Sequence, residues 1–147
     1  MDESPAASHL AGLPIAEFAF PGPLRDRLVA AILDGRKLST TGLVANYQVE
    51  EEALPRPGER SIVVDSSDRP VAVIEVTSVR VVPLGDVDLA HAVAEGEGHT
   101  SVPAWRADHE AFWHSDEMRA ALQDPDFTVD DATPVVLEWF HLVERLS

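Results

Sequence analysis

A β-rich run extends over Val71-Ala72-Val73-Ile74-Glu75-Val76-Thr77-Ser78-Val79. Both alternating faces of this stretch are largely apolar, which is typical of a strand covered on both sides. A second β-rich run, Ser61–Val64, precedes it, and the turn-forming residues 65–70 separate the two runs. This order predicts a β-hairpin in which residues 61–64 pair with residues 71–82.

The rest of the chain mixes helices and strands without a regular alternation. Apolar residues recur at helical spacing in three segments, and two further runs are rich in β-branched or aromatic residues. We therefore expect helices over residues 23–34, 86–94 and 104–121, and strands over residues 43–49 and 135–146. Such a chain is α+β, built on a small, partly closed sheet with helices inserted between the strands.

Length and composition limit the class of protein. The chain has 147 residues, 45% of them hydrophobic, and no cysteine. That length suits one domain, and the lack of cysteine excludes disulfides and thiol chemistry. We expect residues 1–17 to form a flexible arm and residues 18–147 a single domain. Acidic residues stand where a signal peptide would be basic, so we expect a cytoplasmic protein.

The formal net charge of −15 at pH 7 limits the partners. A charge of that sign repels polyphosphate, and no Lys/Arg cluster interrupts it. No apolar run approaches the roughly 20 residues of a membrane span. We therefore expect neither long DNA nor a membrane as partner, but a small substrate or a short single-stranded RNA, bound by a monomer or weak dimer.

A lone lysine stands out in the segment Gly35-Arg36-Lys37-Leu38-Ser39-Thr40-Thr41. The chain has ten arginines, so guanidinium groups meet almost every need for a fixed surface cation. An arginine keeps its proton near neutral pH, whereas burial can turn a lysine amine into a base or a nucleophile. A lysine beside three hydroxyls is therefore a candidate catalytic group. The alternative is that an arginine-rich composition leaves one lysine by chance.

Glu75 lies in the middle of the apolar strand, where a carboxylate needs a buried partner or a cavity, because an unpaired buried charge is costly. One interpretation is a salt bridge to Arg80 or Arg36. The other joins Glu75 to Lys37 and Thr40. In that arrangement a neutral lysine takes the proton of the attacking threonine hydroxyl, and the carboxylic acid returns a proton to the leaving group.

A metal site could be assembled from His99, His109 and His114 with Glu95 or Glu97. The sequence has no HExxH motif and no cysteine pair, and a helix places residues 109 and 114 about 140° apart around its axis. That spacing disfavours shared ligation, so we expect no metal and no other cofactor.

Four motifs follow one another along the chain: Gly35-x-Lys37-x-x-Thr40 after a short helix, the Val-Ile-Glu75-Val strand, Ala94-Glu95-Gly96-Glu97-Gly98-His99 followed by Trp105-Arg106-x-x-His109, and a final Glu138-x-Phe140-x-Leu142-Val143. Together they resemble the ASCH domain family, a branch of the PUA-like β-barrels. The resemblance covers almost the whole expected domain.

This resemblance implies a small PUA-like β-barrel with a cleft in which Lys37, Thr40 and Glu75 converge. Some members of the family are amidohydrolases that remove the acyl group of N4-acetylcytidine, and others are ribonucleases or RNA-binding modules. This chain departs from many members at Gly42 and Leu43, where they carry an arginine shortly after the threonine. Its EGEG...WR segment is similar to that of a larger subgroup.

The first functional hypothesis is hydrolysis of an acylated pyrimidine nucleoside by Lys37, Thr40 and Glu75, with the nucleophile left open among the hydroxyls of residues 39–41. To substrate binding we assign eight residues: Ser39, Thr41, Tyr47, Glu95, Glu97, Trp105, Arg106 and His109.

The second hypothesis is a binding module or ribonuclease for short single-stranded RNA. In that case Tyr47 or Trp105 would stack on a base and Arg106 would contact a phosphate. A third hypothesis is a domain that binds a protein partner.

Overall fold

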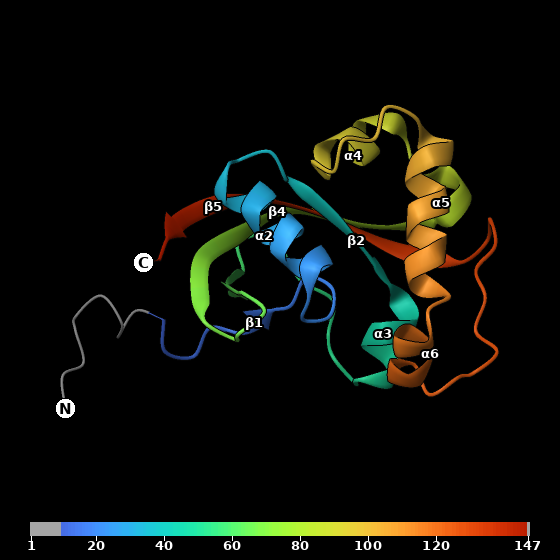
Figure 1. The fold of residues 1–147 in the computed structure, drawn as a ribbon, viewed down its shortest axis with the longest axis horizontal. Helices are drawn as coiled ribbons and strands as arrows, with labels where there is room; N and C mark the ends of the chain where they lie inside the picture. The colour runs from blue at the N-terminus through green and yellow to red at the C-terminus, as the bar shows by residue number, and fades with distance from the viewer. Residues whose placement is uncertain (1–9, 147) are drawn as a thin grey trace.

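A five-stranded mixed sheet forms the centre of the protein in a computed structural model, which describes residues 10–146 (Figure 1). The strands are β1 (Ile15–Ala16), β2 (Ser39–Leu43), β3 (Arg60–Val64), β4 (Pro70–Pro83) and β5 (Pro134–Arg145), in the spatial order β1-β3-β4-β5-β2. β1 runs parallel to β3, and all other neighbours are antiparallel. The fold is α+β, as the sequence predicts.

The predicted hairpin is formed by β3 and β4, and β4 continues along β5 as the longest strand pair. Ala72, Val73 and Ile74 are all buried, so both faces of β4 are covered in this part, as its apolar pattern predicts. From Thr77 onward most of β4 is exposed or half-buried.

The sheet does not close into a barrel, so that part of the expectation is wrong. β1 has two residues and pairs with β3, while β2 pairs with β5. Within residues 10–146 the two edge strands, β1 and β2, do not pair with each other. A barrel requires that pairing, and the result here is an open sheet.

Helix α2 (Pro23–Leu33) confirms the first predicted helix. Pro23 stands at its first turn, where a missing N–H costs no hydrogen bond. Leu28, Val29 and Ile32 pack on the β3–β4 side of the core. Gly35, with φ +77°, follows its end and turns the chain towards β2.

Two predicted elements differ from the structure. Residues 44–49 form helix α3 (Val44–Val49) and not a strand, because the strand lies one segment earlier, in β2. Residues 104–121 form two helices, α5 (Val102–Trp113) and α6 (Asp116–Ala121). The chain breaks between them because the Ser115 hydroxyl accepts from the Met118 amide and starts a new helix.

The remaining elements complete a second part of the core. A 3₁₀ turn (Leu84–Asp86) leads to α4 (Leu89–Ala94), and α4 to α6 enclose a cluster that includes Trp105, Trp113 and Leu122. In Figure 1, β2 runs between α2 and α5, with α4 near its start. The site described below lies along β2.

Residues 1–9 of the expected flexible arm lie outside the described part of the chain. The described part of that arm contributes β1 to the sheet. No helix within residues 10–146 is both long and apolar enough to cross a membrane.

Candidate functional site

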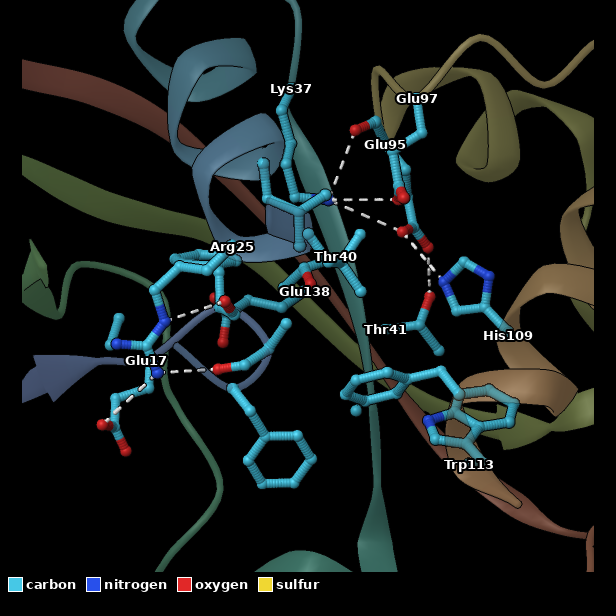
Figure 2. Close-up of a pocket in the computed structure, with 18 of the residues that line it drawn as sticks. Glu17, Arg25, Lys37, Thr40, Thr41, Glu95, Glu97, His109, Trp113 and Glu138 are labelled. Atoms are coloured by element: carbon cyan, nitrogen blue, oxygen red, sulfur yellow. Dashed lines mark hydrogen bonds and ion pairs between the residues drawn. The ribbon is translucent and has the colours of Figure 1, made fainter. Parts of the chain in front are cut away.

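Lys37 lies just after α2 and is 2% exposed. Its Nζ donates to the carbonyl oxygens of Ser39, at 2.9 Å, and Glu95, at 3.3 Å. Carboxylate oxygens of Glu95 and Glu97 lie 3.5 and 3.8 Å from the same nitrogen (Figure 2). All four contacts are with hydrogen-bond acceptors, so Lys37 is the centre of a buried ion-pair cluster.

The segment Glu95-Gly96-Glu97-Gly98 brings the two carboxylates to Lys37. Gly96 has φ +73°, and a Cβ at this position would lie 2.5 Å from the Arg36 carbonyl oxygen and 2.8 Å from the Lys37 Cα. Beside it, the Leu38 amide donates to the Ala94 carbonyl at 2.7 Å. Glycine permits this close approach of two backbones, which a side chain would block.

Glu95, at the end of α4, is 1% exposed and fully engaged. Its Oε2 accepts from the Thr41 hydroxyl at 2.6 Å and from the Trp105 indole at 2.9 Å, and its Oε1 accepts from His109 Nε2 at 3.1 Å. Burial by itself raises the pKa of this carboxyl. Hydrogen bonds from two histidines and the charge of Lys37 outweigh it, so the pKa lies well below its usual range and Glu95 is ionised.

His109, on α5, stacks on Trp105 with ring centroids 4.2 Å apart. Its Nδ1 donates to the Trp105 carbonyl at 2.9 Å, while Nε2 faces Glu95. Burial lowers the pKa of His109, but Glu95 and the carbonyl raise it by more, so the net pKa is above its ordinary value. With an acceptor at each nitrogen, the ring favours its charged form.

The hydroxyls of β2 have different surroundings. Ser39 is fully buried and donates to the His91 carbonyl at 3.1 Å. Thr41 donates to Glu95 and lies 2.7 Å from His91 Nε2. Thr40 lines the cavity, and its hydroxyl makes no hydrogen bond within residues 10–146. Of the three, Thr40 therefore has the hydroxyl that is free to react.

A cavity of about 1230 Å³ opens beside these groups, lined by Lys37, Thr40 and Glu97 among others. Burial raises the pKa of Glu97, Lys37 lowers it and the neighbouring Glu95 raises it again, so the net pKa is above normal. Glu97 is thus the carboxyl next to Lys37 that is better able to take up a proton.

Glu138 lines the cavity beside Thr40, of which it is the cross-strand neighbour in the β2–β5 pair (Figure 2). Burial and the charge of Glu59 raise the pKa of Glu138 to about 7, although Lys37 acts against them. Burial and Glu138 in turn raise the pKa of Tyr47 to about 12, so this cavity phenol stays protonated.

The family model of the ASCH domain matches residues 17–144 of this sequence. The chain belongs to the ASCH domain family.

Two solved structures are similar to this ASCH domain. A protein from Enterococcus faecalis V583, of the family DUF984, is 28% identical with a TM-score of 0.78, covering 90% of this chain and 77% of that chain. An ASCH domain from Lactobacillus crispatus JV V101 is 22% identical with a TM-score of 0.72, covering 96% of this chain and 86% of that chain. No curated protein matched the chain.

In this ASCH domain, Glu75 does not join Lys37 and Thr40. Its Oε1 accepts from Arg60 Nε at 2.9 Å, its Oε2 lies 4.0 Å from His141, and it is not among the residues that line the cavity. The strand order puts Glu75 opposite Arg60 and His141 on its two neighbours. The carboxylates beside Lys37 are Glu95 and Glu97, which the sequence assigned to substrate binding.

Two other predicted contacts have different roles in the ASCH domain. Trp105 is 0% exposed, so no base can stack on it, and its indole orients Glu95. Arg106 pairs with Glu110 and Asp131 and does not line the cavity. Tyr47 and His109 do line the cavity.

The metal ligands considered from the sequence do not form one group in the ASCH domain. His114 accepts from the Val129 amide, and His99 pairs with Asp108 at 2.7 Å. Ligand atoms of Glu95, Glu97 and His109 do lie within 4.8 Å of one another. The positive charge facing both of these carboxylates already comes from Lys37.

Two residues of the ASCH domain site were missed at the sequence level. His91 lies four residues before Glu95, and this i, i+4 spacing on a predicted helix was a usable signal. Glu138 belongs to the last of the four quoted motifs, but its place beside Thr40 could not be predicted, because it depends on the pairing of β2 with β5.

Proposed function

We propose that this ASCH domain is an amidohydrolase that removes the acyl group from an N4-acylcytidine-type nucleoside. One observation carries the proposal: the Lys37 amine is buried between two carboxylates beside a cavity into which Thr40 presents a free hydroxyl. Amine, hydroxyl and carboxyl groups are the parts required for acyl transfer to a threonine.

The two carboxylates support different roles. Glu95 is saturated with donors and remains ionised, so it holds Lys37 in place. Glu97 has the raised pKa, and we assign it the proton that leaves the Lys37 ammonium. The resulting neutral amine accepts the Thr40 proton as Oγ attacks the acyl carbon.

The steps balance. When the C–N bond breaks, the departing nitrogen takes the proton back from Lys37, and the acyl group remains as an ester on Thr40. Water then cleaves this ester, which releases the carboxylic acid and restores the hydroxyl.

The charge of the cavity supports a neutral substrate. Seven of its lining residues are Asp or Glu, and four are Arg or Lys. A nucleoside without phosphate meets less repulsion there than a nucleotide does. The family resemblance supplies the acylcytidine class, and the cavity volume of about 1230 Å³ leaves ample room for it.

Deacylation of N4-acetylcytidine, followed by chromatography of released cytidine, tests the proposal. We expect turnover by the wild type and a loss of at least about a thousandfold in kcat for Thr40→Val, since loss of the nucleophile removes about 4 kcal/mol or more of catalysis. Thr40→Ser retains the hydroxyl and should keep measurable turnover.

Lys37→Arg is the second variant, because arginine keeps the charge but cannot act as a base near neutral pH. We expect it to be inactive. Turnover that is unchanged in Lys37→Arg or in Thr40→Val would remove the proposed mechanism, and no turnover by the wild type would remove the proposed substrate.

Binding or cleavage of short RNA is the less supported function. Its expected stacking residue Trp105 is buried, and its expected phosphate contact Arg106 is paired outside the cavity.

A further inference from the structure

We infer that Glu138 is the residue that reads the base of the substrate, by pairing its carboxyl group with a heterocycle edge that has a hydrogen-bond donor and an acceptor side by side. This inference rests on the proposed function, because it concerns the same cavity. It adds a specificity-determining residue that takes no part in the proton transfers above.

The position of Glu138 supports this role. It lies opposite Thr40 across the β2–β5 pair, where the Cβ atoms of directly facing residues are about 5 Å apart. Its carboxyl makes no hydrogen bond or ion pair within residues 10–146, in contrast to those of Glu95 and Glu97. A half-buried carboxyl in a cavity wall without a protein partner is available to a ligand.

The groups around Glu138 favour a retained proton. Glu59, which precedes β3, repels its negative charge, and Lys37, which follows α2, acts in the opposite direction. Tyr47, on α3, stays protonated, and Thr40, on β2, is uncharged. With a pKa raised to about 7, a large fraction of Glu138 is a neutral carboxylic acid at neutral pH.

A neutral carboxylic acid has an O–H donor next to a carbonyl acceptor. Cytosine presents the complementary pair, an acceptor at N3 and an N–H at N4, and acylation of N4 leaves one N–H in place. Pairing of this edge with Glu138 would hold the N4 substituent near Thr40, where the proposed acyl transfer needs it. An ionised carboxylate cannot donate to N3, so binding requires the protonated form.

Two variants of Glu138 test whether its carboxyl group binds the base of the substrate. Glu138→Gln keeps a donor beside an acceptor at every pH, whereas Glu138→Ala removes both. We expect the KM of the wild type for N4-acetylcytidine to rise roughly 30-fold from about pH 6 to about pH 8.5, as follows for one group with a pKa of about 7. Glu138→Gln should lack this rise, and Glu138→Ala should have a high KM at every pH, with kcat much less affected.

Glu97 and His109 also titrate in this cavity, and both remain in Glu138→Gln, so the difference from wild type isolates Glu138. The inference is overturned if Glu138→Gln keeps the wild-type pH dependence of KM, or if Glu138→Ala leaves KM unchanged.

A binding experiment tells failure of this inference from failure of the proposed function. Cytidine and 3-deazacytidine, which has C–H in place of the N3 acceptor, are titrated into Thr40→Val by calorimetry. We expect tighter binding of cytidine, and equal binding of both in the double variant that also carries Glu138→Ala. This outcome would support the inference even without turnover, whereas equal binding of both ligands by Thr40→Val would overturn it even if the wild type is an amidohydrolase.

Discussion

Glu95 receives its hydrogen bonds from β2 and α5 and also faces Lys37 after α2, so one carboxylate joins segments that are far apart in the sequence. Taking such a charge out of water is costly, and the cost is repaid only when every lone pair is used. Removing the negative charge of Glu95 would leave Lys37 and His109 buried without this opposite charge beside them.

The first prediction compares two glutamates. Glu95→Gln should lower the free energy of unfolding by about 3 to 5 kcal/mol, the usual cost of breaking a buried pair. Glu75→Gln breaks the more exposed pair with Arg60 and should cost at most about 1 kcal/mol. Urea unfolding at pH 7 measures both, and equal losses would contradict the assignment of Glu95 as the buried anchor.

The wild type and Glu95→Gln should also differ in how their stability depends on pH. The pKa of Glu95 is lower in the folded protein than its usual 4.5, so its contribution to stability is present above that value and is lost as the pH falls through the folded pKa. The free energy of unfolding of the wild type should therefore fall more steeply between pH 7 and the acid range than that of Glu95→Gln.

At the scale of elements, the link between α4 and α5 positions the site. Gly96 packs against the backbone of Arg36 and Lys37, so the conformation of one loop determines where Glu95 and Glu97 lie.

The second prediction concerns that loop. Gly96→Ala adds a methyl that would overlap the Arg36 carbonyl, at a position with an unfavourable positive φ, so it should displace the loop and remove most of the proposed deacylase activity. Gly98→Ala is the matched control, since Gly98 also has a positive φ of 87° but no atom within 4 Å of an added Cβ. It should cost about 1 kcal/mol and leave activity largely intact. If both variants behave alike in activity and thermal unfolding, close backbone packing is not what places the carboxylates.

Strands β3, β4 and β5 could be predicted better than the short helices and the two edge strands, since neither β1 nor β2 was predicted as a strand. The β3–β4 hairpin and β5 have long apolar runs, whose period is clear from the sequence alone. Val44–Val49 is a six-residue helix without a buried residue, so it has no amphipathic pattern to detect. The break before α6 was predictable in part, because Ser115 followed by two acidic residues is a helix start.

At the scale of the whole molecule, the strand order determines which residues meet. The sequence could indicate that Lys37 is unusual, but not that β5 lies between β4 and β2. That order places Glu138 next to Thr40 and puts Glu75 beside Arg60 instead. That the sheet stays open could not be predicted for the same reason, because closure depends on whether strands distant in the sequence pair with each other.

The third prediction follows from the net charge. A protein of formal charge −15 should bind a short single-stranded RNA weakly or not at all, because repulsion opposes the roughly 1 to 3 kcal/mol that stacking of one base provides. Fluorescence anisotropy of a labelled oligonucleotide at low and at physiological salt measures this. Tight binding that weakens with salt would favour the RNA hypothesis over a nucleoside substrate.

The single lysine side chain of these 147 residues lines the cavity. A sample isotopically labelled in lysine side chains would therefore give a single Nζ resonance from this chain, with no assignment problem. Any ligand that enters the cavity and approaches Lys37 would be reported by that one signal, whatever its chemical class.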